Sequence, residues 1–235
     1  MTRDRRGELA DALVVDFPLR GEWCAVRSPG SRIPSHGTEI LAQRYAYDLQ
    51  RLGAGRRPHP AGWPRILVTG VPLHECYGWG EPVYSVLDGT VVAAVDGEPE
   101  RKWLHPARES WHAVSNTTTF RPTPAGVRRL IGNHVVVCSG TAYAAYAHLA
   151  PGSVRVSEGQ HVGRGEVLGR VGSSGNSTAP HLHFQVMDDG DPLVARAVPA
   201  VFATYEVWRQ GSWQRVHRSV PETTERIREP STTNE

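Results

Sequence analysis

Alternating apolar and polar residues dominate the second half of the chain. The segments "NHVVVCSG" and "AYAAYAHLA" alternate with a period of two and predict a pair of β-strands. The following "SVRVSEGQHVGRGEVLGRVG" predicts short strands joined by glycine turns, and a last hairpin is expected around Gln210 and Gly211. The pattern therefore favours a protein built mainly from β-strands.

Shorter strands are expected in the first half. The segment "LVVDFPLRGEW" indicates an entering edge strand, where a proline is tolerated because no partner needs its N–H. Residues 53–82 are rich in Gly, Pro and aromatic residues and are expected to be irregular. After them, "PVYSVLDGTVVAAVDG" predicts two short strands joined as a hairpin by a turn at Asp88 and Gly89.

Residues 97–130 interrupt the strand pattern with a long polar insertion. An insertion of this length on a compact domain is a binding element, a lid or a mobile loop. His105 and His112 lie within it. We expect both to face solvent, with a place on the rim of a cleft as the alternative.

Composition supports this class of fold. The 235 residues include 24 Gly and 18 Pro, which suits a turn-rich β-protein better than a helical bundle. The formal charge of +2 argues against a nucleic-acid-binding stripe. The three cysteines are widely spaced, so neither a disulfide framework nor a cysteine metal site is expected.

Membrane and export signals are not visible in the sequence. No run of 18 apolar residues occurs, so no transmembrane helix is expected. The N-terminal charges are followed by only four apolar residues before Asp16, which is too short for a secretory signal.

The richest stretch for chemistry is "GSSGNSTAPHLHFQVM" at residues 172–187. Side chains two apart on a strand share a face, so His181 and His183 stand side by side while Leu182 and Phe184 turn into the core. The Gly/Ser/Asn/Pro run before them is a loop that delivers the pair. A His-x-His pair alone is more often a polar face than a metal site, so its meaning depends on other residues.

Three further residues are candidates. His36 is presented by a Pro/Gly/Ser loop, and Asp48 lies on an expected strand from Tyr45 to Leu49. A carboxylate among apolar neighbours must face water at a strand end, pair with an arginine such as Arg44, or bind a cation, and the sequence leaves these alternatives open. His148 ends an apolar strand just before a Pro-Gly turn and on its own would be structural.

Together these segments resemble the lysostaphin-like (M23, LytM-type) zinc metallopeptidases. The resemblance is carried from Pro82 to Gln185 by "PVYSVLDGTVV", "GNHVVV" and "YAHLAPGSVRVSEGQHVGRGEVLGRVGSSGNSTAPHLHFQV". With the weaker His/Asp segment it covers residues 22–205. It implies a mainly β fold: a compact antiparallel β-sheet or sandwich with a groove (lysostaphin-type, duplicated hybrid motif), with irregular N-terminal and mid-chain loops.

The resemblance also implies a site. In this family Zn²⁺ is held by a His, an Asp and the second His of His-x-His, which correspond here to His36, Asp48 and His183. His148 and His181 would be the catalytic pair that assists attack of a zinc-bound water on a peptide bond, with peptidoglycan cross-links as the family's usual substrate. One departure is clear. The first His and the Asp are usually four residues apart, whereas His36 and Asp48 are twelve apart, so the extra residues are expected to loop out.

The expected organisation has four parts: an N-terminal segment of residues 1–21, a metallopeptidase domain of residues 22–205 that includes the 97–130 insertion, a hairpin extension of residues 206–220 and a disordered tail of residues 221–235. The expected partner is a peptide or peptidoglycan substrate, with no nucleic acid and a monomeric chain. The resemblance implies a place at the cell wall, although no export signal is visible.

The main alternative is a peptidase-like module that keeps the groove but binds or regulates a cell-wall or protein partner without cleaving it. The glycine-rich hairpins also resemble biotinyl and lipoyl carrier domains. Those need a lysine at a hairpin tip, and Lys102, the one lysine in the chain, lies in the insertion. The carrier interpretation is therefore rejected.

Overall fold

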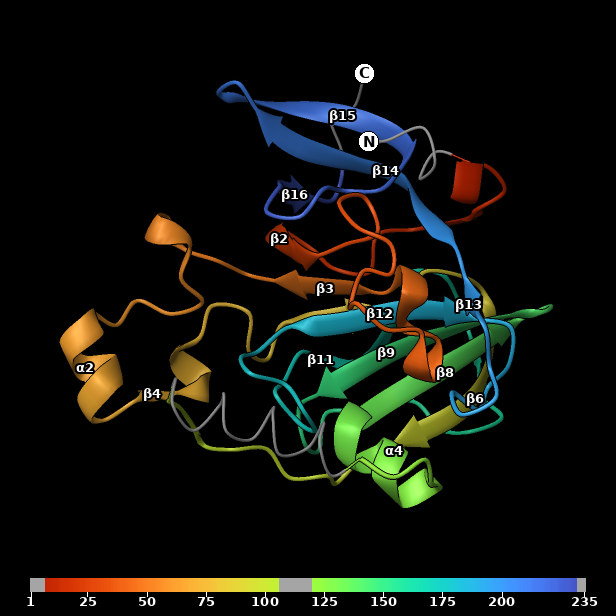
Figure 1. Ribbon diagram of the computed structural model, residues 1–235, viewed down its shortest axis with the longest axis horizontal. Coiled ribbons are helices and arrows are strands. Elements are labelled where there is room, and N and C mark those ends of the chain that lie inside the picture. Colours follow the sequence, from red (N-terminus) through yellow and green to blue (C-terminus); the bar gives the residue numbers. More distant parts are fainter. Residues whose placement is uncertain (1–6, 106–119, 232–235) are drawn as a thin grey trace.

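The computed structural model describes residues 7–105 and 120–231. Over these residues the protein is mainly β, and one large mixed sheet contains twelve strands (Figure 1). Its order is β1 (Leu13–Val15), β14 (Ala200–Arg209), β16 (Arg226–Arg228), β2 (Glu22–Arg27), β3 (Tyr47–Gln50), β12 (Leu182–Met187), β9 (Ala142–Leu149), β8 (Asn133–Ser139), β6 (Gly89–Val95) and β10 (His161–Val162). In addition, β13 (Ala197–Val198) pairs with β12 and β15 (Ser212–Ser219) with β14. All these pairs are antiparallel except β1 with β14.

Smaller elements flank the sheet. Two short pairs stand apart from it: β5 (Pro82–Tyr84) with β11 (Val167–Arg170), and β4 (Val71–Pro72) with β7 (Trp103–Leu104). The helices are α2 (Trp63–Val68), α4 (Pro124–Ile131) and the 3₁₀ turns η1 (Ile40–Tyr45), η2 (Ala54–Arg56) and η3 (Leu73–Glu75). No helix in the described part of the chain is both long and apolar enough to span a membrane.

The start and end of α4 follow from its sequence. The Thr123 hydroxyl accepts the Gly126 N–H at 3.1 Å and caps the first turn, where Pro124 needs no N–H partner. Gly132 ends the helix at φ 65°, a conformation that glycine adopts without a steric cost. The helix therefore stops where β8 begins.

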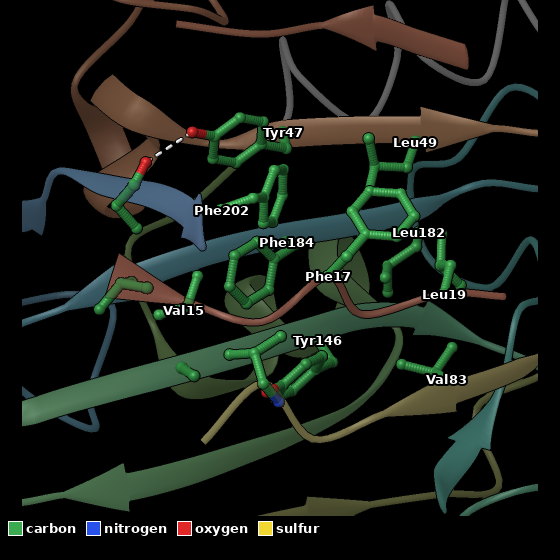
Figure 2. Packing of buried hydrophobic residues seen from close by; sticks show 14 of the residues in the cluster. Val15, Phe17, Leu19, Tyr47, Leu49, Val83, Tyr146, Leu182, Phe184 and Phe202 are labelled. Carbon is green, nitrogen blue, oxygen red and sulfur yellow. Dashed lines mark hydrogen bonds between the residues drawn. The ribbon is translucent and has the colours of Figure 1, made fainter. Parts of the chain in front are cut away.

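The core lies on one face of the large sheet. Figure 2 shows the ring of Phe202 between Tyr47 and Phe184, with ring centroids 4.9 Å and 6.2 Å away. The Tyr47 hydroxyl donates to the Ala200 carbonyl at 2.6 Å, which gives this buried polar group a partner. Phe184 is fully buried. Because neighbouring residues of β12 point to opposite faces, burying Phe184 sends His183 and Gln185 to the other face.

Several sequence expectations are confirmed. The strands predicted in "NHVVVCSG" and "AYAAYAHLA" are β8 and β9, and they pair. The hairpin predicted around Gln210 and Gly211 joins β14 to β15. The entering segment provides β1, which lies at the end of the sheet order. Period-two alternation was sufficient for these elements because one face of each strand packs on the core.

Other expectations are wrong. The segment around Asp88 and Gly89 is not a hairpin: β5 pairs with β11, while β6 pairs with β8 and β10. Between β5 and β6, the Val86 N–H donates to the Tyr146 hydroxyl in the core at 2.8 Å, and β5 finds its partner in β11 instead of β6. The strand expected from Tyr45 begins at Tyr47, since Tyr45 ends η1.

The tail and the insertion are also more regular than expected. Residues 226–228 form β16 between β14 and β2, and Ile227 is fully buried there, so the prediction of disorder from residue 221 is wrong for this part. The insertion at 97–130 contains β7 and α4. His112 lies outside the described residues.

We predict that Phe184→Ala destabilises the protein by about 3–5 kcal/mol, because it removes the aromatic side chain that joins β12 to the core and leaves a cavity. Chemical denaturation measures the change. Val194→Ala is the control: Val194 is 70% exposed, so its truncation should stay within about 0.5 kcal/mol of the wild type. A loss at Phe184 as small as that at Val194 would contradict this account of the core.

Candidate metal centre

Asp48 and His183 meet because their strands are neighbours. β3 and β12 pair with Asp48 directly opposite His183, and residues opposite each other in a sheet project from the same face. Asp48 Oδ1 lies 2.9 Å from His183 Nδ1. Both residues are buried, at 7% and 9% exposure. The strand register thus positions two of the three residues of a potential cation site.

His36 reaches the same carboxylate from the loop before η1. The Ser35 N–H donates to the Arg44 carbonyl at 2.9 Å, so the chain between His36 and Asp48 closes on itself as a loop. His36 Nε2 lies 3.0 Å from Asp48 Oδ2. The ligand atoms of His36, Asp48 and His183 all lie within 4.8 Å of one another. The twelve-residue spacing is therefore looped out, as expected from the sequence.

Hydrogen bonds on the side away from Asp48 determine which nitrogen of the His183 and His36 rings carries the proton. His183 Nε2 bonds to Gln185 Oε1 at 2.9 Å, and Gln185 donates its own amide N–H to the Leu41 carbonyl at 2.8 Å. Gln185 Oε1 is thus an acceptor, so His183 carries its proton on Nε2 and has a lone pair on Nδ1.

The same logic applies to His36. The Ser35 hydroxyl donates to the Gln43 carbonyl at 3.2 Å and accepts from His36 Nδ1 at 3.0 Å. The lone pair of His36 is therefore on Nε2, facing Asp48. Three acceptors converge with no proton between them, an arrangement that a cation stabilises. Two imidazoles and one carboxylate are a ligand set typical of a catalytic Zn²⁺ site.

Two further histidines stand beside this cluster. His148 Nδ1 donates to the Ser174 carbonyl at 2.9 Å, and His181 Nδ1 donates to the Ala179 carbonyl at 2.8 Å. Their ring centroids are 4.9 Å apart, and His181 Nε2 is 3.5 Å from Asp48 Oδ1. The lone pair of His148 is therefore on Nε2, the nitrogen away from its carbonyl. Burial would lower the pKa of His181, but the Asp48 carboxylate that its Nε2 faces raises it.

A β-bulge aims His148 at the site. Asn133 and Val135 of β8 pair with Leu149 and Tyr146 of β9, so β9 carries one extra residue there. His148 has φ 62°, which is uncommon for a residue other than glycine and typical of functional sites. Tyr146 and Leu149 both point into the core. The bulge therefore frees His148 to lie on the opposite face with His183.

Burial and mutual charge shift the pKa values in the cluster. Burial alone would raise the pKa of Asp48, but the surrounding histidines, His181 first, hold it well below its usual range. Burial, followed by the charges of His181 and His183, places the pKa of His148 well below its usual range. Burial also lowers the pKa of His36, although Asp48 opposes the shift. Asp48 is thus ionised and His148 neutral near neutral pH.

The cluster forms the floor of a cleft of about 680 Å³. η1 and α4 supply apolar walls, and the loop before β12 supplies polar side chains. The residues that line the cleft in addition to the five described are Val26, Arg27, Thr38, Ile40, Leu41, Gln43, Gln50, Phe120, Leu130, Ile131, Asn176 and Thr178. The cleft is large enough for a segment of peptide above the cluster.

Some sequence candidates lie elsewhere. Arg44 does not pair with Asp48 but with Glu8 and Glu39. The arginine near Asp48 is Arg27, with Nε 3.6 Å from Oδ2. His105 bonds to the Leu67 carbonyl and does not line the cleft.

Two useful residues were missed from the sequence. Gln185 shares the strand face of His183 by the period of two, so the pattern could have indicated it. Arg27 could not be found in this way, because a bulge between Ala25 and Arg27 shifts its register.

Comparison with known proteins places these residues in a family context. Residues 113–195 match the model of peptidase family M23. His148, His181 and His183 fall inside this segment, whereas His36 and Asp48 lie outside it and join the site through the fold. The match therefore covers three of the five clustered residues but neither His36 nor Asp48.

Characterised relatives match over short segments. The peptidoglycan DD-endopeptidase ShyA of Vibrio cholerae is 40% identical over 65 residues, which are 27% of this chain and 15% of that protein. The DD-carboxypeptidase/endopeptidase Mpg of Neisseria meningitidis is 34% identical over 112 residues, or 41% of this chain and 25% of that protein. The matches span no more than a quarter of these relatives. The solved catalytic domain of lysostaphin from Staphylococcus simulans aligns with 60% of this chain and 82% of its own, at 22% identity and a TM-score of 0.34.

We predict that Gln185→Leu weakens the affinity for Zn²⁺ by about 10- to 100-fold, because His183 loses the acceptor that keeps its proton on Nε2. Titration against a chelating dye of known affinity measures the change. Gln214→Leu on the exposed face of β15 is the matched control and should bind the ion as the wild type does. Equal affinity in Gln185→Leu and Gln214→Leu would show that Gln185 does not orient the ligand.

Proposed function

We propose that this chain is a zinc-dependent endopeptidase that hydrolyses peptide cross-links of peptidoglycan, a proposal that the match of residues 113–195 to peptidase family M23 supports. The observation that carries the proposal is the convergence of His36, Asp48 and His183 through atoms within 4.8 Å of one another. Their inward atoms are all acceptors, and this set leaves one position of a tetrahedral ion for water or substrate.

The proposed division of labour follows from the geometry. His36, Asp48 and His183 would hold Zn²⁺, and the negative charge of Asp48 would offset part of its charge. The ion would supply polarisation of the peptide carbonyl and would lower the pKa of water. Gln185 and Ser35 keep the two ligand rings in the tautomer that binds a cation.

His148 and His181 are proposed to handle protons and charge. Each donates its Nδ1–H to a backbone carbonyl, so each presents Nε2, which has a lone pair when the ring is neutral. A neutral imidazole in this orientation can accept the proton of an attacking water and later pass it to the leaving amine. Once protonated, such a ring also stabilises the oxyanion of the tetrahedral intermediate. Two rings side by side allow one to serve the water and the other the oxyanion.

Peptidoglycan is the proposed substrate because two relatives are named for its hydrolysis or for cleavage of D,D-peptide bonds. A substrate of this kind places the proposed site of action at the cell wall. The cleft fits an extended peptide, since its walls combine apolar side chains of η1 and α4 with polar side chains of the opposite loop.

A peptidase-like binding module without activity is the competing hypothesis. Such a module needs the cleft but not the proton-ordered set of ligands or the strained backbone of His148. Elemental analysis distinguishes the two, because the peptidase is expected to hold about one zinc ion per chain.

We predict that His183→Ala loses both zinc and hydrolysis, whereas His148→Ala keeps its zinc but loses about 10²- to 10⁴-fold in kcat, the usual contribution of a general acid or base. Asp48→Ala should behave as His183→Ala does. Zinc content by elemental analysis and release of peptides from purified peptidoglycan are the two measurements. Loss of zinc from His148→Ala to the same extent as from His183→Ala would overturn the proposed role of His148.

A further inference from the structure

Arg27 stands out among the residues of the cleft by its charge. Of the described residues that line the cleft, Arg27 and Asp48 are the two with side chains that are charged at every pH near neutrality. The remaining polar side chains are histidines, amides and hydroxyls. Asp48 is proposed to belong to the metal, so Arg27 is the fixed charge available to a substrate.

The fold places Arg27 at the site through a second β-bulge. Ala25 pairs with Leu49 and Arg27 with Asp48, so β2 has one residue more than β3 across this step. The extra residue turns Arg27 toward the face that carries Asp48. Bulges of this kind are over-represented beside active sites, where they re-aim a side chain.

The contact between Arg27 and Asp48 does not use up the guanidinium. Nε lies 3.6 Å from Asp48 Oδ2, which is an ion pair but too long for a hydrogen bond. The Arg27 side chain is 55% exposed, against 11% for Asp48. Within the described part of the chain, Arg27 has no other ion-pair partner. Its remaining N–H donors therefore face the open cleft or water.

A bound metal ion would favour binding of an anion beside Arg27. Asp48 would then share its charge with the ion, and Arg27 would face a second positive centre. Because Arg27 Nε lies 3.6 Å from Asp48 Oδ2, an anion beside Arg27 would relieve the repulsion between the two positive charges.

We propose that Arg27 binds a carboxylate of the substrate residue next to the scissile bond. The inference rests on the proposed function and specifies its substrate class. Consecutive Cα atoms are about 3.8 Å apart, so a carboxylate one residue from the cleaved carbonyl falls within reach of the guanidinium. The planar fork of Arg suits a carboxylate through two parallel N–H···O bonds.

Such a carboxylate has two chemical sources. If the enzyme removes a C-terminal residue, the carboxylate is the free C-terminus of the substrate. If the enzyme cuts within a chain, the carboxylate belongs to a side chain. Both present the same anion to Arg27, and matched peptides distinguish them.

The test uses three peptides that share one cleavable bond: a free C-terminal carboxylate beside the bond, the same peptide amidated, and an amidated peptide with a side-chain carboxylate beside the bond. The zinc-loaded wild type, Arg27→Gln and Arg27→Lys are compared, with Arg155→Gln, an exposed residue outside the cleft, as the control. Binding of the same peptides to zinc-loaded His148→Ala, with and without Arg27→Gln, is measured by calorimetry.

The wild type is expected to prefer one carboxylate peptide over its amide. In Arg27→Gln this ratio of kcat/KM should fall about 10- to 100-fold, the usual effect of losing a charge-assisted hydrogen bond, mainly through KM. Arg27→Lys should retain part of the preference, and Arg155→Gln all of it. Zinc content should stay unchanged in every variant.

The inference is overturned if the wild type shows no preference, or if Arg27→Gln keeps it. It is also overturned if Arg27→Gln lowers zinc content and acts equally on all three peptides, because Arg27 would then support Asp48 alone. If no peptide is cleaved but calorimetry shows a carboxylate preference that depends on Arg27, the proposed function fails while the inference stands.

Discussion

A buried carboxylate opposite a buried imidazole is the constraint on which the site depends. Burying an unpaired carboxylate costs several kcal/mol, yet Asp48 lies in the middle of the large sheet. The register of β3 against β12 offsets this cost by placing His183 directly opposite Asp48. His36 closes the other side of the carboxylate. Once the register is set, an arrangement of acceptors around one point follows, which is the basis for proposing a divalent cation there.

The same strand supports the core and the site. Alternate residues of β12 point to opposite faces, so Leu182 and Phe184 are buried in the core. On the other face His183 lines the cleft, and Gln185 lies buried behind it in hydrogen-bond contact. A slip of one residue would exchange the two sets. The apolar packing around Phe184 therefore holds the ligand in register, and sites built on strands in this way are more precise than sites built on loops.

The sequence predicted the regular part of this arrangement well. The mainly β fold, β8, β9, the last hairpin and the shared face of a His-x-His pair all follow from a period of two. The structure also brings together His36, Asp48 and His183, which the sequence linked by family resemblance. What could not be predicted depends on contacts between distant segments. β-bulges have no sequence signal here, so the placement of Arg27 was not foreseeable, and His148 was linked to the site by family resemblance alone. The Asp88 turn failed because β5 finds its partner in β11.

The loop that separates His36 from Asp48 does more than bridge these two proposed ligands. It contains Leu41, which has φ 57°, a strained conformation for a residue with a side chain. The Leu41 carbonyl accepts the amide N–H of Gln185, and this bond leaves the Gln185 oxygen to accept the proton of His183. The loop thus holds the tautomer of a ligand that lies far along the chain. Strain at Leu41 is understandable if it serves this bond, since strained backbone persists where the surrounding structure requires it. The long spacing between His36 and Asp48 therefore supports the site. Shortening the loop would remove the Leu41 carbonyl that orients Gln185, and Gln185 in turn accepts the proton of His183.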